Sequence, residues 1–270
     1  MDLNLRGKRA MVSGSTLGIG RSIAKILHTE GADVIINGRH QDSVEKTVHE
    51  IQNAKGLSPA KISGCAADLS RAQGVTKLVN FCQKEGPIDI LINNVGIFNI
   101  KEFLEIEDDD WQEIFELNVM SGVRLSRAFL PSMLNNNWGR IIFIGSDQSS
   151  KPNPSMSHYA MTKTALVSIS RSLAELTKNT GITVNTVQVA PTWTDGVKIF
   201  IEEMANQEKT TVEAMTREYF TEGEGQTSLI QRWADPSEIG NVVAFLCSPL
   251  ASAINGSAPR ADGGMVRSLF

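Results

Sequence analysis

Short aliphatic runs alternate with longer amphipathic stretches along the first two thirds of the chain. The runs are rich in Val and Ile and short enough to be strands, whereas apolar positions in the stretches recur with a helical period. This alternation predicts βαβ units in one doubly wound, parallel α/β sheet with helices on both faces. We expect strands at residues 9–13, 33–37, 61–66, 88–92, 140–145 and 183–189, and helices at residues 18–30, 41–54, 71–85, 110–136 and 157–178.

No repeat, low-complexity tract or linker interrupts this pattern, so we expect a single domain spanning residues 1–270. Residues 195–231 do not follow the alternation of strands and helices, because they contain two helical stretches, 197–206 and 211–220, and no strand pattern. Long connections of this kind are often lids or binding segments. We therefore expect a helical substrate lid here, and a surface excursion is the alternative.

Composition and charge exclude several classes of function. The chain carries 26 Lys and Arg against 30 Asp and Glu, which gives a net charge of −4 at pH 7 and no broad cationic surface for nucleic acid or anionic lipid. No stretch is apolar for long enough to predict a membrane span or an export signal. Cys65, Cys82 and Cys247 are widely spaced and odd in number, which favours a reducing, cytoplasmic compartment over a disulfide framework or a metal site.

A glycine-rich turn directly follows the first expected strand. Gly14 permits a tight turn, Gly18 removes a Cβ that would obstruct a dinucleotide, and Gly20 lets the next helix approach the sheet. The unpaired N–H groups at the start of that helix can then bind a pyrophosphate. The residues of this turn that we expect to contact the cofactor are Gly14, Ser15, Thr16, Gly18, Ile19 and Gly20.

The ends of the second and third expected strands bear on the choice of cofactor. Arg39 stands near the position where an acidic residue would bind the ribose of NAD, and its guanidinium suits the 2′-phosphate of NADP. We therefore expect NADP(H), with NAD(H) as the alternative if Arg39 is a solvated surface residue. Asp68 is suited to the adenine amino group and equally to capping the next helix, and Leu69 beside it is expected at the same site.

Tyr159 and Lys163 lie four residues apart in an expected helix and therefore share one face. An ammonium group near a tyrosine favours the phenolate, so the tyrosine can act as a general acid and base near neutral pH. Ser146 follows the fifth expected strand, where open α/β sheets bind ligands, and its hydroxyl can bind a substrate carbonyl. Further site residues expected at this edge of the sheet are Asn94, Gly96 and Asn118.

Together these motifs resemble the classical short-chain dehydrogenase/reductase family along essentially the whole chain, and most closely its 3-oxoacyl-acyl carrier protein reductase type. The resemblance implies a Rossmann-type sheet of about seven strands. It implies that Tyr159 protonates the carbonyl oxygen and that Lys163 lowers the pKa of Tyr159 and binds the nicotinamide ribose. Ser146 would then hold the carbonyl, and Asn118 would anchor a water that relays protons.

The segment after the sixth strand both matches the family and departs from it. Thr194 matches the threonine that lies beside the nicotinamide carboxamide, whereas Thr192 stands where the family usually has glycine. Val95 likewise stands where the family usually has alanine. Trp193 is expected either to wall the substrate pocket or to pack beneath the lid.

The resemblance implies an oxidoreductase that transfers a hydride between NADP(H) and a ketone/secondary alcohol pair. The acidic lid favours a free small or lipophilic ketone, and a 3-oxoacyl thioester is a second candidate substrate. A non-catalytic NADP(H)-binding or interaction protein with the same fold is the alternative. The intact set of four catalytic candidates disfavours that alternative, since a retired site has no physical need for all of them.

The family resemblance further implies a homotetramer or a dimer. The expected contacts are the helices at 110–136 and 157–178 and the C-terminal residues 266–270. Some apolar residues on these helices would be exposed unless a partner subunit covers them. These residues are Leu125, Phe129 and Leu173.

Overall fold

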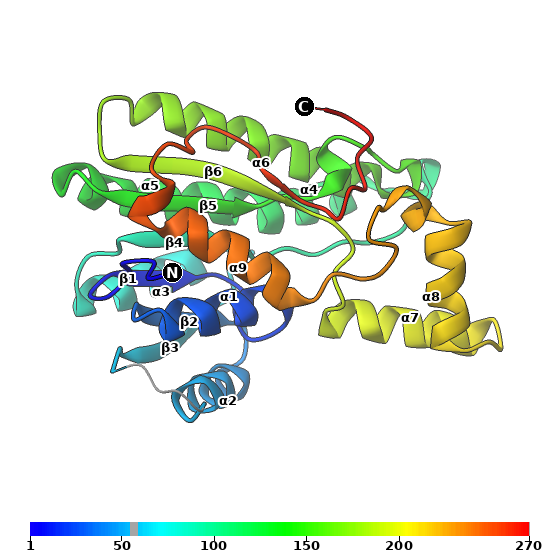
Figure 1. Cartoon of the computed structure of the whole chain (residues 1–270), viewed down its shortest axis with the longest axis horizontal. Coiled ribbons are helices and arrows are strands. Elements are labelled where there is room, and N and C mark those ends of the chain that lie inside the picture. Colours follow the sequence, from blue (N-terminus) through cyan, green and yellow to red (C-terminus); the bar gives the residue numbers. More distant parts are fainter. Residues whose placement is uncertain (55–58, 270) are drawn as a thin grey trace.

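The computed structural model describes residues 1–54 and 59–269, and its centre is a parallel sheet (Figure 1). Phe270, which ends the expected C-terminal contact segment, lies outside the described residues. Within them the sheet has seven strands in the order β3-β2-β1-β4-β5-β6-β7. Successive strands are added toward one edge of the sheet up to β3 and toward the other edge from β4 onward, so the predicted doubly wound fold is confirmed. The strands are β1 (Arg9–Val12), β2 (Asp33–Gly38), β3 (Ile62–Ala66), β4 (Ile90–Asn93), β5 (Gly139–Ile144), β6 (Ile182–Val189) and β7 (Arg260–Ala261).

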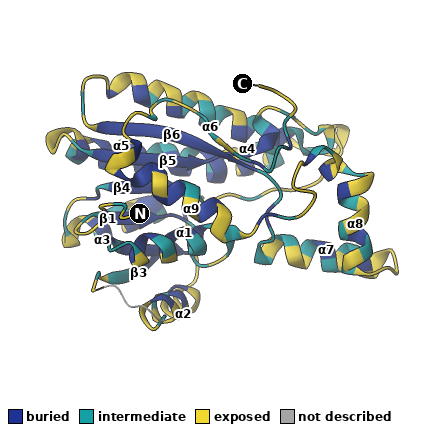
Figure 2. Ribbon diagram, in the orientation of Figure 1, coloured by how far each residue is buried: buried dark blue, intermediate teal, exposed yellow. Residues whose placement is uncertain are grey.

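Helices cover both faces of the sheet because successive strand residues point to opposite sides. Ala10 and Val12 of β1 pack on one face with α1, α2 and α9, whereas Met11 packs on the other with α3, α5 and α6. Figure 2 shows the strands buried between these two layers. The helices are α1 (Gly18–Thr29), α2 (Gln41–Gln52), α3 (Ala72–Glu85), α4 (Asp108–Phe115), α5 (Ser121–Asn135), α6 (Ser157–Leu176), α7 (Asp195–Gln207), α8 (Val212–Thr221) and α9 (Pro236–Cys247).

The stretch predicted as one helix at 110–136 consists of three pieces. A π-helical turn, Glu116–Met120, separates α4 from α5. A π-turn adds one residue to a helical turn while leaving the apolar pattern on either side intact, so periodicity alone does not reveal it. This turn carries Asn118, whose side chain is buried.

Two of the residues expected to need a partner subunit are buried within the chain itself. Leu125 and Phe129 are 0% and 2% exposed, because α5 packs against β4 and β5 of the sheet and against α3 beside it. The expectation was therefore wrong for these two residues, and their burial gives no argument for an oligomer. Leu173 on α6 is partly buried against the same core.

Residues 195–231 form α7 and α8, which extend beyond one end of the strands (Figure 1). The two helices share a small apolar cluster of their own, built on Ile201, Ala205 and Met215 and separate from the two cores of the sheet. Among the described residues, no helix is both long and apolar enough to cross a bilayer.

Candidate active site

The turn between β1 and α1 is held in place by two asparagines. Asn94 donates from Nδ2 to the carbonyl oxygens of Ser13 and Gly14, at 2.9 and 3.0 Å. Asn37 accepts from the Gly14 N–H at 3.2 Å. Gly14 and Gly18 have φ angles of +59° and +54°, in the left-handed region that favours glycine. The structure thus places Asn94 behind the turn, where it fixes the shape of the turn.

The start of α1 lies very close to this turn. A Cβ on Gly20 would come within 2.4 Å of both Asn94 Nδ2 and the Gly14 carbonyl oxygen. Ser15 is fully buried and donates its hydroxyl proton to the carbonyl oxygen of Val12 at 2.7 Å, while Ile19 packs against the apolar core. The side chains of these residues therefore serve the fold of the turn. Thr16 is partly buried, with its methyl group beside Gly38 at the end of β2.

A cavity of about 610 Å³ adjoins the ends of β2 and β3, and Arg39, Asp68, His40 and Lys77 all contribute to its lining. Asp68 accepts a hydrogen bond from the Ser70 N–H at 3.0 Å, so it fixes the local turn and does not cap α3, which begins at Ala72. That hydrogen bond, assisted by the charge of Arg39, lowers the pKa of Asp68.

The residue after Asp68 has a different environment. The Leu69 side chain is 2% exposed and packs in the core between the sheet and α3, α5 and α6. A contact of Leu69 with a cofactor would therefore have to involve its backbone.

Asp195 brings a carboxylate to the N-terminus of α1. Its Oδ2 accepts from the Gly18 N–H at 3.0 Å and lies 3.7 Å from the guanidinium of Arg21. Thr194 caps α7 by accepting from the Val197 N–H, and its methyl group faces Gly18. A helix N-terminus favours anions, so this carboxylate lies where a pyrophosphate is expected. Our sequence analysis missed Asp195, for which the only signal was its position after Thr194.

Ser146, Tyr159 and Lys163 meet beyond the end of β5. Lys163 Nζ lies 5.4 Å from the centre of the Tyr159 ring and donates to the carbonyl oxygen of Ile144 at 2.9 Å. Burial raises the pKa of Tyr159 to about 12, although a hydrogen bond with Ser146 acts in the opposite direction. Burial also lowers the pKa of Lys163 to about 8. The expected lowering of the Tyr159 pKa by Lys163 is therefore not seen, because burial dominates and Lys163 Nζ is bound to the Ile144 carbonyl oxygen. At neutral pH the tyrosine is protonated and the lysine is mostly charged, a state suited to donating a proton.

Asn118 links two elements of this site. Its Oδ1 accepts from the Ile97 N–H and its Nδ2 donates to the Ile97 carbonyl oxygen, both at 2.8 Å. The same Nδ2 donates to the hydroxyl of Thr162 on α6 at 3.2 Å. A Cβ on Gly96 would lie 3.3 Å from Asn118 Oδ1 and 3.5 Å from Lys163 Nζ. The structure therefore brings these candidates together, with the Asn118 carboxamide engaged in fixing the connection after β4.

Aromatic side chains surround the outer part of the site. Trp193 lies 5.6 Å from Trp233 between ring centres and packs against the cluster of α7 and α8, which favours the packing role over the pocket wall. Phe98 lies nearer the site, edge-on to Tyr159 at 6.2 Å and to Phe200 of α7 at 6.3 Å. Our sequence analysis did not single out these two phenylalanines, which form an apolar side of the space next to Tyr159.

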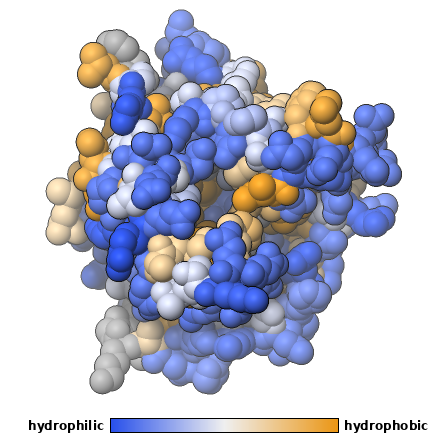
Figure 3. Space-filling model, turned by 90° about the vertical axis from the view of Figure 1, so that its right-hand side faces the viewer, coloured by the Kyte–Doolittle hydropathy of each residue, from blue (hydrophilic) through white to orange (hydrophobic). Residues whose placement is uncertain are grey.

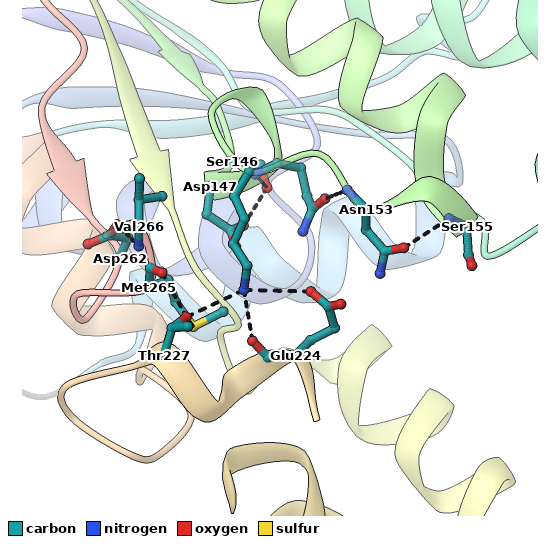
Figure 4. Close-up of polar contacts among 11 residues, drawn as sticks. Ser146, Asp147, Asn153, Ser155, Glu224, Thr227, Asp262, Met265 and Val266 are labelled. Carbon is teal, nitrogen blue, oxygen red and sulfur yellow. Dashed lines mark hydrogen bonds and ion pairs between the residues drawn. The ribbon is translucent and has the colours of Figure 1, made fainter. Parts of the chain in front are cut away.

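The positions after Ser146 hold a second group that the sequence analysis missed. Ser146 donates its hydroxyl proton to Asp147 at 2.9 Å, and Figure 4 shows the two side chains next to each other. Burial raises the pKa of Asp147 to about 6. Lys151 lies 3.7 Å from the carboxylate of Glu224 and donates to the Glu224 carbonyl oxygen at 3.0 Å. This pair joins the strand end that carries Ser146 to the segment after α8. The signal in the sequence was simply that Asp147 follows Ser146.

Comparisons with known proteins agree with this arrangement. The family model for short chain dehydrogenase matches residues 8–205. The uncharacterized oxidoreductase YvrD of Bacillus subtilis (strain 168) is 46% identical over 269 residues, and the match covers 100% of each chain. The 3-oxoacyl-[acyl-carrier-protein] reductase FabG of Aquifex aeolicus (strain VF5) is 32% identical, over 98% of this chain and 100% of that protein.

A solved structure extends the likeness to three dimensions. L-sorbose reductase from Gluconobacter frateurii, complexed with NADPH and L-sorbose, matches with a TM-score of 0.93 at 30% identity and covers 100% of both chains. The sheet order, the glycine turn and the family match lead to the same assignment. The chain belongs to the short-chain dehydrogenase family of oxidoreductases.

Proposed function

We propose that this protein is an NADP(H)-dependent reductase that interconverts a small ketone and its secondary alcohol. The observation that carries this proposal is the meeting of Ser146, Tyr159 and Lys163 at the end of β5, with the tyrosine protonated and the lysine mostly charged at neutral pH. The fold alone would not suffice, because one fold hosts many functions.

The four catalytic candidates take different roles in this proposal. Tyr159 donates its proton to the carbonyl oxygen, which Ser146 holds by a hydrogen bond, and the Lys163 charge stabilises the phenolate that remains. When bound, a nicotinamide would supply the hydride that the carbonyl carbon accepts. Asn118 fixes the connection at Ile97 and anchors the water that returns a proton toward Lys163.

The residues at the other end of the site fit NADP(H). The glycine turn and the start of α1 would hold a pyrophosphate once the Asp195 carboxylate leaves the Gly18 N–H, and Thr194 lies beside this position. Arg39 and Lys77 line one cavity and together supply two positive charges for a 2′-phosphate, with Asp68 in the same cavity for the adenine. The L-sorbose reductase structure holds NADPH in the same fold, which supports this choice over NAD(H).

We assign residues 195–231 the role of a substrate lid within a single domain. Phe200 of α7 contacts Phe98, which contacts Tyr159, so the lid reaches the site of reaction. The face that carries α7 and α8 is mostly hydrophilic with separate hydrophobic patches (Figure 3). A small free ketone suits a site bordered by Phe98 and Phe200 and by the acidic side chain of Asp147. The likeness to FabG of Aquifex aeolicus keeps a 3-oxoacyl thioester as the second candidate.

For the assembly we propose a homotetramer or a dimer in the cytoplasm. The helices expected at the contacts expose Leu134 on α5 and Leu176 on α6, at 39% and 65%. Apolar side chains exposed on neighbouring helices are the kind of surface that a second subunit covers. Light scattering at micromolar concentration should therefore give a mass of two or four chains, and a monomer would contradict the proposal.

The catalytic part of the proposal is tested with a Tyr159→Phe variant. Because the ring stays and only the proton donor is lost, we expect kcat for ketone reduction to fall by about 100- to 10,000-fold while NADPH affinity changes little. NADPH oxidation is followed with a panel of ketones, and cofactor affinity by tryptophan fluorescence. If the wild type binds NADPH and reduces no ketone, the protein is a non-catalytic binding module instead.

A further inference from the structure

The carboxylate of Asp147 is only half satisfied. The residue is 4% exposed, and its Oδ1 accepts from the Ser146 hydroxyl (Figure 4). Its Oδ2 is buried and has no hydrogen-bond partner among the described residues. Buried polar atoms in folded proteins are nearly always paired, so an orphaned carboxylate oxygen points to a donor that arrives with a ligand.

The described side chains near Asp147 do not provide that donor, and the Gln148 N–H donates to Ser146 Oγ at 3.2 Å. The Lys151 ammonium donates to the Glu224 carbonyl oxygen at 3.0 Å and to the Thr227 hydroxyl at 3.4 Å. The Asp262 carboxylate accepts from two backbone N–H groups and adds a further negative charge nearby. A second anion is unfavourable in such a place, since like charges repel at close range. The missing donor therefore belongs to a group that is not an anion, and a hydroxyl is the simplest one.

The position of Asp147 ties it to the reacting carbonyl. Its charge acts on the hydroxyl groups of Tyr159 and of Tyr219 on α8, so the carboxylate lies near both a catalytic candidate and the lid. Its Oδ1 is 2.9 Å from Ser146 Oγ, the atom that holds the carbonyl in the proposed function. Two oxygen atoms on adjacent carbons of one small molecule are separated by a similar distance, so one substrate can contact both side chains.

We propose that Asp147 selects neutral ketones that carry a hydroxyl group on the carbon next to the carbonyl, including polyhydroxy ketones. The substrate hydroxyl donates to the Asp147 carboxylate while the carbonyl oxygen lies at Ser146 and Tyr159. The Ser146 hydroxyl, which donates to Asp147 Oδ1 in the structure, turns to the carbonyl oxygen as the substrate hydroxyl takes its place at the carboxylate. The rest of the substrate lies toward Phe98 and Phe200. This inference rests on the proposed function and names its substrate class.

The test compares three ketones that differ only in one hydroxyl group. For the wild type we expect kcat/KM for 1-hydroxy-2-butanone to exceed that for 2-butanone by about 10- to 100-fold, the usual effect of a hydrogen bond to a charged group. With 4-hydroxy-2-butanone, whose hydroxyl is one carbon further away, most of this advantage should be lost. Equal values for the three ketones would overturn the inference and leave the proposed reductase intact.

The Asp147→Asn variant assigns the preference to this side chain. The amide oxygen can still accept from Ser146, whereas the amide nitrogen replaces the free acceptor with a donor. The ratio of kcat/KM for 1-hydroxy-2-butanone to 2-butanone should then fall to within about threefold. The control variant Glu222→Gln, which removes an exposed charge from the lid at residues 195–231, should leave this kcat/KM ratio unchanged. A ratio that stays at the wild-type value in Asp147→Asn would overturn the inference.

A binding measurement keeps the inference testable without turnover or a change at position 147. In the Tyr159→Phe protein saturated with NADPH, calorimetry should show 1-hydroxy-2-butanone binding at least about tenfold tighter than 2-butanone. Equal affinities would count against a role for Asp147 whatever the kinetics show. Tighter binding of the hydroxy ketone together with an inactive wild type would instead refute the reductase and support the selective site.

Discussion

The glycine turn after β1, which we call the cofactor end of the site, and the residues after β5, which we call the reacting end, are built in different ways. At the glycine turn, polar groups are paired: Asn94 and Asn37 bind the backbone of Ser13 and Gly14. At the end of β5, ionisable groups are buried with shifted pKa values, and Asp147 keeps an unpaired oxygen. The hydrogen bonds at the glycine turn fix the conformation of the backbone. The ionisable groups at the end of β5 are buried at a cost in free energy that a bound ligand can reduce. We infer that the first end binds and the second end reacts.

This difference also predicts how substitutions at each end affect the protein. A backbone cradle depends on glycines that no other residue can replace without a clash, as at Gly20. The reacting end depends on charges, whose effect varies with pH and with the bound ligand. Changes at the first end should therefore act on cofactor affinity, and changes at the second on kcat and its pH dependence.

The largest effect on binding is expected where the cofactor end meets the 2′-phosphate. Arg39→Ala should weaken NADPH binding by about 10- to 100-fold, the range typical of a lost charge-assisted hydrogen bond, and leave NADH binding unchanged. Both affinities are measured by tryptophan fluorescence. Arg71→Ala is the matched control, because Arg71 is exposed nearby but does not line the cavity. A parallel loss for NADH would show that Arg39 serves the fold and not the phosphate.

Much of the fold was predictable because the strands are short Val- and Ile-rich runs between amphipathic helices. The helices of the 195–231 segment were placed within two residues of α7 and α8. The π-turn at Glu116–Met120 was not predictable, since it changes the backbone and leaves the apolar pattern unchanged. The burial of Leu125 was likewise not predictable from the sequence, because it depends on how α5 packs against α3, which is distant along the chain.

The candidate site shows the same division. Ser146, Tyr159 and Lys163 could be predicted because strand order and helix spacing alone bring them together. Asp195 could not, because it contacts a residue 177 positions away and does so only once the lid has its place. The role proposed for Asp147 could not be predicted either, because it depends on a buried carboxylate oxygen that has no hydrogen-bond partner in the described part of the folded structure.

An intermediate effect is expected at the reacting end, in the pH profile of ketone reduction. Burial lowers the pKa of Lys163 to about 8, so this residue is charged below that pH and neutral above it. Because the charge stabilises the Tyr159 phenolate, kcat/KM should be level near pH 7 and fall by about tenfold per unit above pH 8. In Lys163→Arg, where the guanidinium does not titrate, the alkaline decline should vanish from the remaining activity. A level profile up to pH 10 in the wild type would contradict this assignment.

The smallest effect is expected where the two ends share a residue. Asp195 belongs to the lid, yet its carboxylate accepts from the Gly18 N–H where the cofactor end should bind a pyrophosphate. Asp195→Asn retains an acceptor for that N–H and removes the negative charge, so NADPH should bind about two- to fivefold tighter at low salt. Glu203→Gln, an exposed change on the same helix, is the control for charge alone. Weaker binding in Asp195→Asn would mean that the carboxylate supports the cofactor through Arg21, and the lid would then depend on the cofactor end for its position.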